Sequence, residues 1–174
     1  FSAAPAGTLD EMADYLREGY WTEGGSGRSF HWNLTSSGLN PNDGVLLYNV
    51  SGFTHSGRSD ADGIAEDRKV LVREAFKLFE ATLGIDFEET TSDDTATVDF
   101  FFQDNDSGAY ASSGYSYYPG QPGMISRSYI NVADTWSGGT STYDDYTLQT
   151  ILHEIGHALG LGHQGAYNGS AGYP

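Results

Sequence analysis

The chain has 174 residues, enough for one domain with a substantial core, and 38% of them are hydrophobic. Its 24 acidic and 8 basic residues give a formal net charge of −16, which argues against nucleic acid or an anionic membrane as a partner. The sequence contains no cysteine, which excludes disulfides and thiolate metal ligands, and it has no apolar run long enough to span a membrane.

A short amphipathic helix is the first predicted element, over residues 8–19. Thr8 and Glu11 match a capping box, in which each side chain accepts a hydrogen bond from the backbone of the other residue. The apolar residues of this segment recur at helical spacing: Leu9, Met12 and Leu16. A Gly/Ser-rich stretch over residues 24–29 then predicts a loop.

A longer helix is predicted over residues 62–83, with Gly84 ending it. Its apolar face comprises Val72, Ala75, Phe76, Phe79 and Leu83. Strand-like runs lie before and after this helix, at residues 45–50, 85–90, 97–103, 114–118 and 128–132. Helices interleaved with about five strands predict an α/β or α+β layered architecture.

The most informative segment is residues 153–163, which read HEIGHALGLGH. Helical positions four apart differ by about 40° in azimuth and about 6 Å in rise, so His153 and His157 project from adjacent turns of one face. If the helix continued, His163 would lie about 15 Å along the axis from His153, too far to share an ion with Zn–N bonds of about 2.0–2.1 Å. The chain must therefore turn back, and Gly160 accepts the positive-φ conformation that commonly ends a helix.

Glu154 supplies the second part of this pattern. Three imidazole ligands, from His153, His157 and His163, leave a fourth coordination position for water, as in a catalytic rather than a structural zinc site. Glu154 can reach that water without binding the metal, which is the role of a general base. The motif fixes five positions: the three histidines, Glu154 and Gly160. This pattern is expected by chance in roughly 3 of 100,000 sequences of this composition, so an amphipathic helix with solvated histidines is the weaker interpretation.

The residues around this motif predict a helix from about residue 145 to residue 160. Its apolar positions fall on the side opposite the two histidines: Leu148, Ile151, Leu152, Ile155 and Leu159. Asp144 and Asp145 come just before it and fit either a helix cap, where a carboxylate meets free backbone N–H groups, or plain solvated surface. We expect one face of this helix to pack on the core and the other to face a cleft.

Other polar motifs are less informative. Residues 60–63 and 104–108 resemble fragments of calcium-binding loops, but neither has the EF-hand spacing, so turns are expected there. His31 and His55 lack metal-ligand spacing, and surface or capping roles are expected for them.

The motif at residues 153–163 is that of the metzincin zinc endopeptidases, and the wider run from Thr150 to Leu161, followed by Tyr167 and Asn168, resembles the serralysin family. The similarity extends through most of the chain. It implies an α+β domain with a metzincin-like twisted mixed β-sheet, a long backing helix and a zinc-binding active-site helix. It also implies a bacterial enzyme that is secreted.

The resemblance further implies a substrate-binding strand. In this family an edge strand above the cleft pairs with the substrate backbone, and its pattern of small and aromatic residues before a proline is similar to Gly114, Tyr115, Ser116 and Tyr117 here. An extended peptide would then add to the sheet as a further strand. Without that resemblance, the tyrosines would indicate ordinary aromatic packing on an edge strand.

The sequence departs from the family pattern after its last histidine. Residues 164–166 read Gln-Gly-Ala where the family commonly has Pro-Gly-Asp, and both methionines, Met12 and Met124, precede the motif. We therefore expect residues 1–174 to be the upper subdomain of a protease catalytic domain, truncated before the methionine turn. The first residue, Phe1, suggests that a leader or pro-segment has been removed. Calcium, if bound, is expected mainly in the missing C-terminal region, where the family has its β-roll repeats.

The motif predicts a zinc endopeptidase that hydrolyses internal bonds of protein or peptide substrates, and the resemblance to serralysins implies that it is secreted and extracellular. The alternative is an inactive zinc-binding fragment that needs its missing C-terminal half as a partner. That C-terminal part and a proteinaceous inhibitor are the other expected partners, whereas nucleic acid and membranes are not.

Overall fold

The computed structural model describes residues 8–23, 27–143 and 145–163. Its helical elements are α1 (Leu9–Asp14), the π-helical segment η1 (Tyr15–Gly19), α2 (Tyr20–Glu23), α3 (Glu66–Leu83), the short 3-10 segment η2 (Trp136–Gly139) and α4 (Tyr146–Ala158). Its strands are β1 (Phe30–Trp32), β2 (Val45–Asn49), β3 (Phe53–His55), β4 (Arg58–Asp60), β5 (Asp86–Glu89), β6 (Phe100–Gln103), β7 (Ala109–Ser116) and β8 (Gly123–Val132). The α+β fold predicted from the sequence is confirmed.

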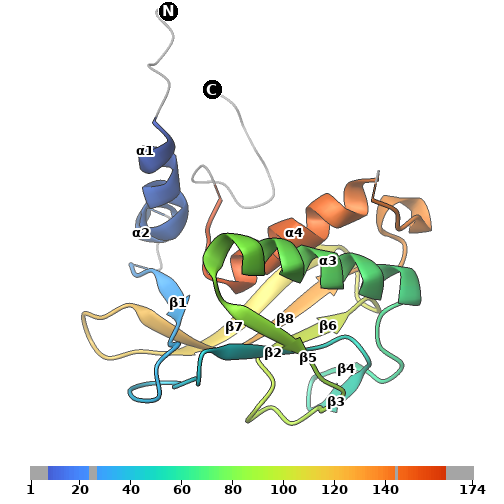
Figure 1. Cartoon of the computed structure of the whole chain (residues 1–174), viewed down its shortest axis with the longest axis horizontal. Coiled ribbons are helices and arrows are strands. Elements are labelled where there is room, and N and C mark those ends of the chain that lie inside the picture. Colours follow the sequence, from blue (N-terminus) through green and yellow to red (C-terminus); the bar gives the residue numbers. More distant parts are fainter. Residues whose placement is uncertain (1–7, 24–26, 144, 164–174) are drawn as a thin grey trace, which may run out of the picture.

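Six of the strands form one sheet, in the order β1-β8-β6-β2-β5 with β7 paired to β8 (Figure 1). Every pairing is parallel except that of β7 with β8, which is antiparallel. β8 pairs with β1 through residues 123–125 and with β6 through residues 128–131, while β7 accompanies it along its length. Among the described residues β7 has no second strand partner, so it is an edge of the sheet.

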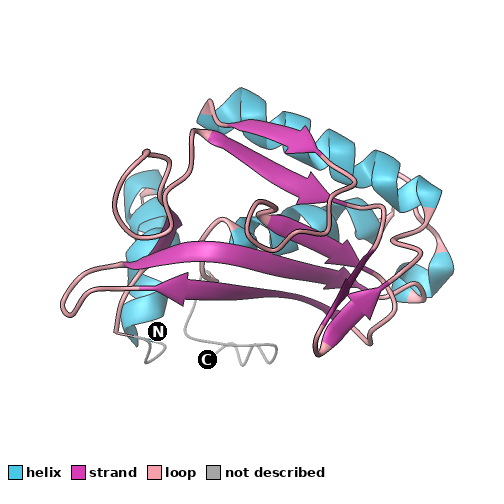
Figure 2. Cartoon of the chain, turned by 90° about the horizontal axis from the view of Figure 1, so that it is seen from below, coloured by secondary structure: helices cyan, strands magenta, loops and turns pink. Residues whose placement is uncertain are grey.

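Helices cover one face of the sheet, and the β3–β4 hairpin covers part of the other (Figures 1 and 2). α3 and α4 pack on the first face, where their buried residues join Phe100 and Phe102 of β6 in one core. The antiparallel β3–β4 hairpin contributes Phe53, which packs against Phe101 in a second cluster. β6 is therefore buried throughout, because successive side chains of a strand point to opposite faces and both faces are covered at this strand.

The helices follow the prediction with three differences. The N-terminal helix was expected to end at residue 19, but the helical segment continues through η1 and α2 to Glu23. The capping box is confirmed: the Glu11 backbone N–H donates to the Thr8 hydroxyl at 3.2 Å, and the Thr8 N–H donates to the Glu11 carboxylate at 2.7 Å. The long helix begins at Glu66 rather than at residue 62, because Gly63 has a φ of 72° and cannot belong to a right-handed helix. Leu83, predicted to face the core, is 48% exposed in the last turn of α3.

The strands differ more from the prediction. The strand expected over residues 114–118 is wrong in its limits, because β7 spans Ala109–Ser116 and its length follows from pairing with β8. The structure also contains β1 and the β3–β4 hairpin, which the sequence did not predict. Each of these strands has only three residues, too few for an alternating pattern to stand out.

One carboxyl group is buried within this framework. Asp99 is 8% exposed just before β6, and its carboxylate accepts a hydrogen bond from the Leu47 backbone N–H at 2.8 Å. Burial outweighs this hydrogen bond and raises the pKa of Asp99 to about 6. A carboxyl whose pKa is higher in the folded than in the unfolded chain binds its proton more tightly when folded. Its contribution to stability is therefore greatest in acid and is lost as the pH rises through about 6.

We expect Asp99→Asn to raise the free energy of unfolding at pH 8 by about 1–3 kcal/mol, because the amide carries no charge to desolvate and its oxygen can still accept from Leu47. At pH 4 the gain should shrink towards zero. Urea unfolding of both proteins at the two pH values measures the difference. A gain of equal size at both would contradict the assignment.

Candidate metal centre and active-site cleft

Helix α4 carries the first two histidines of the motif and starts at a side-chain cap. The Asp145 carboxylate accepts hydrogen bonds from the backbone N–H groups of Thr147 at 2.7 Å and Thr142 at 3.0 Å. These bonds are the main reason that the pKa of Asp145 is lowered, with the bond to Thr142 the larger cause. Of the two interpretations of the acidic pair, Asp145 is thus a cap, while Asp144 lies outside the described residues.

The chain reverses at the end of α4, as the glycine spacing predicted. Gly160 has a φ of 102°, and its N–H donates to the His157 carbonyl at 2.9 Å. The next N–H, from Leu161, donates to the Gly156 carbonyl at 3.0 Å, which completes a Schellman motif. A side chain at Gly160 would also overlap the carbonyl group of Phe30 in β1. Both the backbone conformation and the close approach therefore require glycine.

This reversal brings the three histidines together. The Nε2 atom of His157 lies 2.9 Å from that of His153 and 2.9 Å from that of His163. Three nitrogens about 2.0–2.1 Å from a tetrahedral zinc would be about 3.3 Å apart, close to the spacing here. Within the described part of the chain, this is the one group of three His, Asp or Glu side chains whose ligand atoms all lie within 4.8 Å of one another. The residues present therefore fit a small divalent ion.

Two further features suit these imidazoles to metal binding. The Nδ1 of His157 lies 2.8 Å from the Leu161 carbonyl, which can only accept, so Nδ1 carries the proton and Nε2 is left with its lone pair. Burial lowers the pKa of both His153 and His157, and the neighbouring imidazoles lower it further. Neutral imidazole is the form that binds a metal.

Glu154 lies beside the histidines and is almost completely buried. Its side chain lines a cavity of 590 Å³ that it shares with His153, His157 and His163. Burial raises the pKa of Glu154 to about 7, and a hydrogen bond from the Ala111 backbone offsets part of that effect. A carboxyl that titrates near neutrality can both take up and release a proton at ordinary pH.

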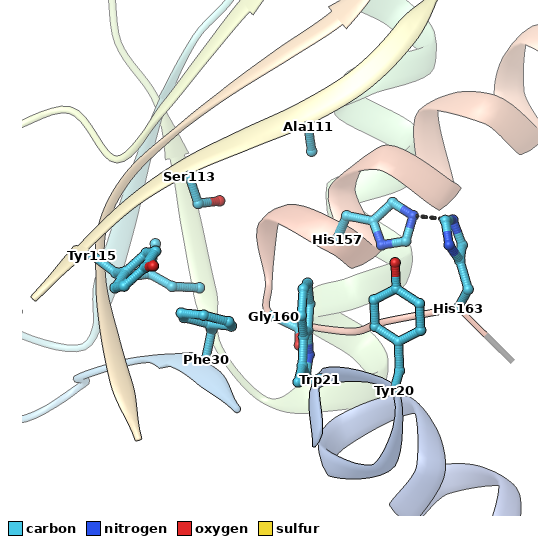
Figure 3. A pocket seen from close by; sticks show the side chains of 10 residues that line it. Tyr20, Trp21, Phe30, Ala111, Ser113, Tyr115, His157, Gly160 and His163 are labelled. Carbon is cyan, nitrogen blue, oxygen red and sulfur yellow. Dashed lines mark hydrogen bonds between the residues drawn. The ribbon is translucent and has the colours of Figure 1, made fainter. Parts of the chain in front are cut away.

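A cleft extends on both sides of the histidines, below strand β7. On one side is a cavity of 340 Å³ with aromatic walls (Figure 3), formed mainly by Tyr20, Trp21, Phe30 and Tyr115. On the other side is the 590 Å³ cavity, whose walls include Ala109, Ala111, Trp136 and Tyr146. The short side chains of Ala111 and Ser113 point from β7 towards the gap between the aromatic residues and the histidines (Figure 3).

Of the four residues expected in a substrate-binding strand, one lines this cleft. Gly114, Tyr115 and Ser116 belong to β7, and Tyr115 lines the aromatic cavity. Tyr117 lies beyond the end of the strand, with the Arg28 guanidinium 3.7 Å above its ring.

The part of β7 nearest to Glu154 and the histidines is residues 109–113, which the sequence prediction missed. The alternation of small residues at Ala109, Ala111 and Ser113 was the signal for it. Tyr20 and Trp21 were also missed, because nothing in the N-terminal sequence indicates that this helix reaches the cleft.

The comparisons with known proteins agree with this geometry. The family model described as Matrixin matches residues 46–169. A serralysin from Photorhabdus sp. (strain Az29) is 30% identical over 86% of this chain and 29% of its own length. The metallopeptidase AprA of Pseudomonas marginalis is 27% identical over 98% of this chain and 34% of its own length. Human matrix metalloproteinase-25 is 26% identical over 71% of this chain and 23% of its own length.

The α+β fold, the histidine-bearing helix beneath the edge strand of the sheet and the family match together identify a metalloprotease catalytic domain of the metzincin type. The chain belongs to the matrixin family and is serralysin-like within it, as the resemblance of its motif predicted. It spans about a third or less of the length of the relatives named above. None of the helices in the described ranges is long and apolar enough to cross a membrane.

Replacing Gly160 tests whether the reversal depends on the contact with β1. We expect Gly160→Ala to lower the free energy of unfolding by about 2–4 kcal/mol, because it adds a steric overlap with Phe30 to the usual penalty for alanine at positive φ. Gly84→Ala is the matched control, since Gly84 also ends a helix at positive φ but has open space where a Cβ would lie. That control should lose only about 1 kcal/mol. Equal losses in urea unfolding would show that the contact with Phe30 is unimportant.

Proposed function

We propose that this chain is the zinc-binding part of a secreted endopeptidase that hydrolyses internal peptide bonds, with His153, His157 and His163 holding the zinc. One observation carries the proposal: three imidazole nitrogens converge beside a buried carboxyl group, in a cleft that follows an edge strand. Membership of a metalloprotease family supports the same conclusion. Three protein ligands would leave an open coordination position, as catalytic zinc sites require.

Each residue of the site would have a separate role in hydrolysis. Bound zinc would supply Lewis-acid chemistry, lowering the pKa of a water molecule and polarising the scissile carbonyl. Glu154 is placed to take the proton of the attacking water and to deliver it to the departing amine. In the metal-free chain burial raises the pKa of Glu154, and a carboxyl in such surroundings takes up a proton more readily than an exposed one. The hydrogen bond of His157 to Leu161 keeps the ring in the orientation and tautomer that ligation needs.

We propose that the substrate binds as an extended peptide along β7. The outer edge of β7 has no strand partner among the described residues, so its backbone can pair with a further strand, except where the Ala111 backbone meets the Glu154 carboxylate. Ala111 and Ser113 leave room for substrate side chains, and Tyr115 offers an aromatic wall. Gly114, Ser116 and Tyr117 would contact the peptide farther from the metal, towards the Ser116 end of β7.

The activity of the whole protein and its partners belong to the same proposal. The relatives are about three to four times as long as the part matched here, so further sequence can complete the active site or bind calcium. A C-terminal portion of the protein and a proteinaceous inhibitor would both contact the cleft side of this domain. Secretion follows from the similarity to serralysins and is proposed on that basis.

We predict that Glu154→Gln will bind zinc like the parent chain but cleave a protein substrate at least a hundredfold more slowly, because the amide cannot accept the proton of the water. The same substitution removes a buried ionisable group, so the fold should be at least as stable above pH 7. Zinc content, urea unfolding and casein cleavage are measured side by side on both proteins. Undiminished cleavage would refute the role of Glu154.

The cleavage assay also separates this proposal from its alternative. A protease whose activity disappears with a chelator and returns with zinc is the expected result for the 174-residue chain or for a longer form that contains it. If both forms bind zinc but neither cleaves protein, the chain is a zinc-binding module without protease activity. If no zinc binds, the metal assignment itself is wrong.

A further inference from the structure

The N-terminal helical segment, residues 8–23, contacts the turn that carries the third histidine. The Gly162 backbone N–H donates a hydrogen bond to the Leu16 carbonyl at 2.7 Å. The indole N–H of Trp21 donates to the Gly160 carbonyl at 2.8 Å. Two hydrogen bonds from one segment therefore hold the two glycines on either side of Leu161.

Side-chain packing strengthens the same contact. The ring of Tyr20 meets the ring of His163 edge-on, with 5.3 Å between centroids and an angle of 81° (Figure 3). Gly162 has no room for a side chain, because Tyr20 occupies the position that a Cβ would take. The backbone of the turn is thus in direct contact with the helical segment, with no side chain of Gly162 between them.

The helical segment has an irregular backbone at this place. Residues Tyr15–Gly19 form a π-helical turn, in which the Tyr20 N–H donates to the Tyr15 carbonyl five residues back. Leu16, whose carbonyl accepts from Gly162, lies inside that turn. Single π-helical turns within α-helices are uncommon and frequently occur at functional sites.

The three histidines depend on different parts of the chain for their positions. His153 and His157 are fixed by α4, whose buried side packs in the core. His163 lies beyond the helix, so its position depends on the turn at residues 160–162 and on whatever holds that turn. The contacts described above come from a segment about 140 residues earlier in the sequence.

We propose that the N-terminal helical segment positions the third metal ligand, with Trp21 and the Leu16 carbonyl holding the turn so that His163 faces the other two histidines. This inference rests on the proposed zinc site. Trp21 is a positioning residue, since it touches the turn and not the reacting atoms. Preorganised ligands bind a metal more tightly because less conformational freedom is lost on binding. By linkage, zinc must in return stabilise the docking of the segment on the turn.

The test is the zinc affinity of the 174-residue chain, measured by competition with a chromophoric chelator. Trp21→Phe keeps an aromatic ring but removes the indole N–H, and we expect zinc to bind about tenfold more weakly. Tyr15→Phe is the control within the same helical segment, because it removes the hydrogen bond from the Tyr15 hydroxyl to the Glu23 carboxylate at 2.7 Å and leaves both hydrogen bonds to the turn in place. Its zinc affinity should stay within about twofold of the parent.

A double-mutant comparison shows whether Trp21 acts through His163. In a His163→Ala background, which retains two histidines, Trp21→Phe should no longer change zinc affinity. A general loss of structural integrity would weaken zinc binding in both backgrounds. An effect of Trp21→Phe that persists without His163 would therefore overturn the proposal.

A second variant and a measurement on the parent chain test the same proposal if Trp21→Phe fails to fold. Gly162→Ala should weaken zinc binding by tenfold or more, because its methyl group would displace the turn from Tyr20, whereas Gly156→Ala has room for a methyl group and should not. In the parent chain, saturating zinc should slow amide hydrogen exchange across residues 9–23.

The outcomes distinguish the inference from the proposed function. A parent chain that binds zinc tightly, with Trp21→Phe and Gly162→Ala equally tight and exchange unchanged in residues 9–23, overturns the positioning role alone. A parent chain that takes up no zinc overturns the proposed site, and the positioning role with it.

Discussion

The reversal of the chain at Gly160 is the constraint on which the site depends. A straight continuation of α4 would carry His163 away from His153 and His157, and only the left-handed conformation at Gly160 returns it. The same residue is in close contact with the carbonyl group of Phe30 in β1, so the reversal is tied to the sheet. Local backbone conformation and long-range packing thus act on one glycine, and the histidine cluster is the result.

The remainder of the fold provides a rigid support for that turn. The sheet is buried on both faces around β6, which fixes β8 and through it the edge strand β7. α4 is held against the same sheet by its buried residues Ile151 and Ile155. Ala111 on β7 and Glu154 on α4 consequently meet across the cleft, although they belong to different layers. Preorganisation of this kind is what a hydrolytic site requires, because the groups that move protons must already be in place.

Much of the site could be predicted from the sequence because its signals are local. The spacing of His153 and His157 on one helix, the glycine that ends that helix, and the capping box at Thr8 all involve residues within one or two turns of each other. Such features are determined by hydrogen bonds between residues close in sequence, so they can be recognised from the sequence itself. The assignment of Asp145 as a cap needed the structure only to choose between two stated interpretations.

What escaped prediction depends on contacts between distant parts of the chain. The extent of β7 follows from its register with β8. The tyrosines near its end indicated a strand that begins at residue 114, five residues after its actual start at Ala109. β1 has only three residues, too few to show an alternating pattern. The contact of its Phe30 carbonyl with Gly160 therefore could not be predicted. The contact between Trp21 and Gly160 joins residues 139 positions apart, and no periodicity in either segment indicates it.

The central claim is that three imidazoles bind one zinc ion and leave a position open. X-ray absorption spectroscopy of the zinc-loaded chain, with the metal content determined on the same sample, tests it most directly. We predict one zinc per chain, with three imidazole nitrogens at about 2.0–2.1 Å and one or two oxygen ligands completing the shell. A zinc bound by fewer than three imidazoles, or surrounded only by oxygen, would contradict it.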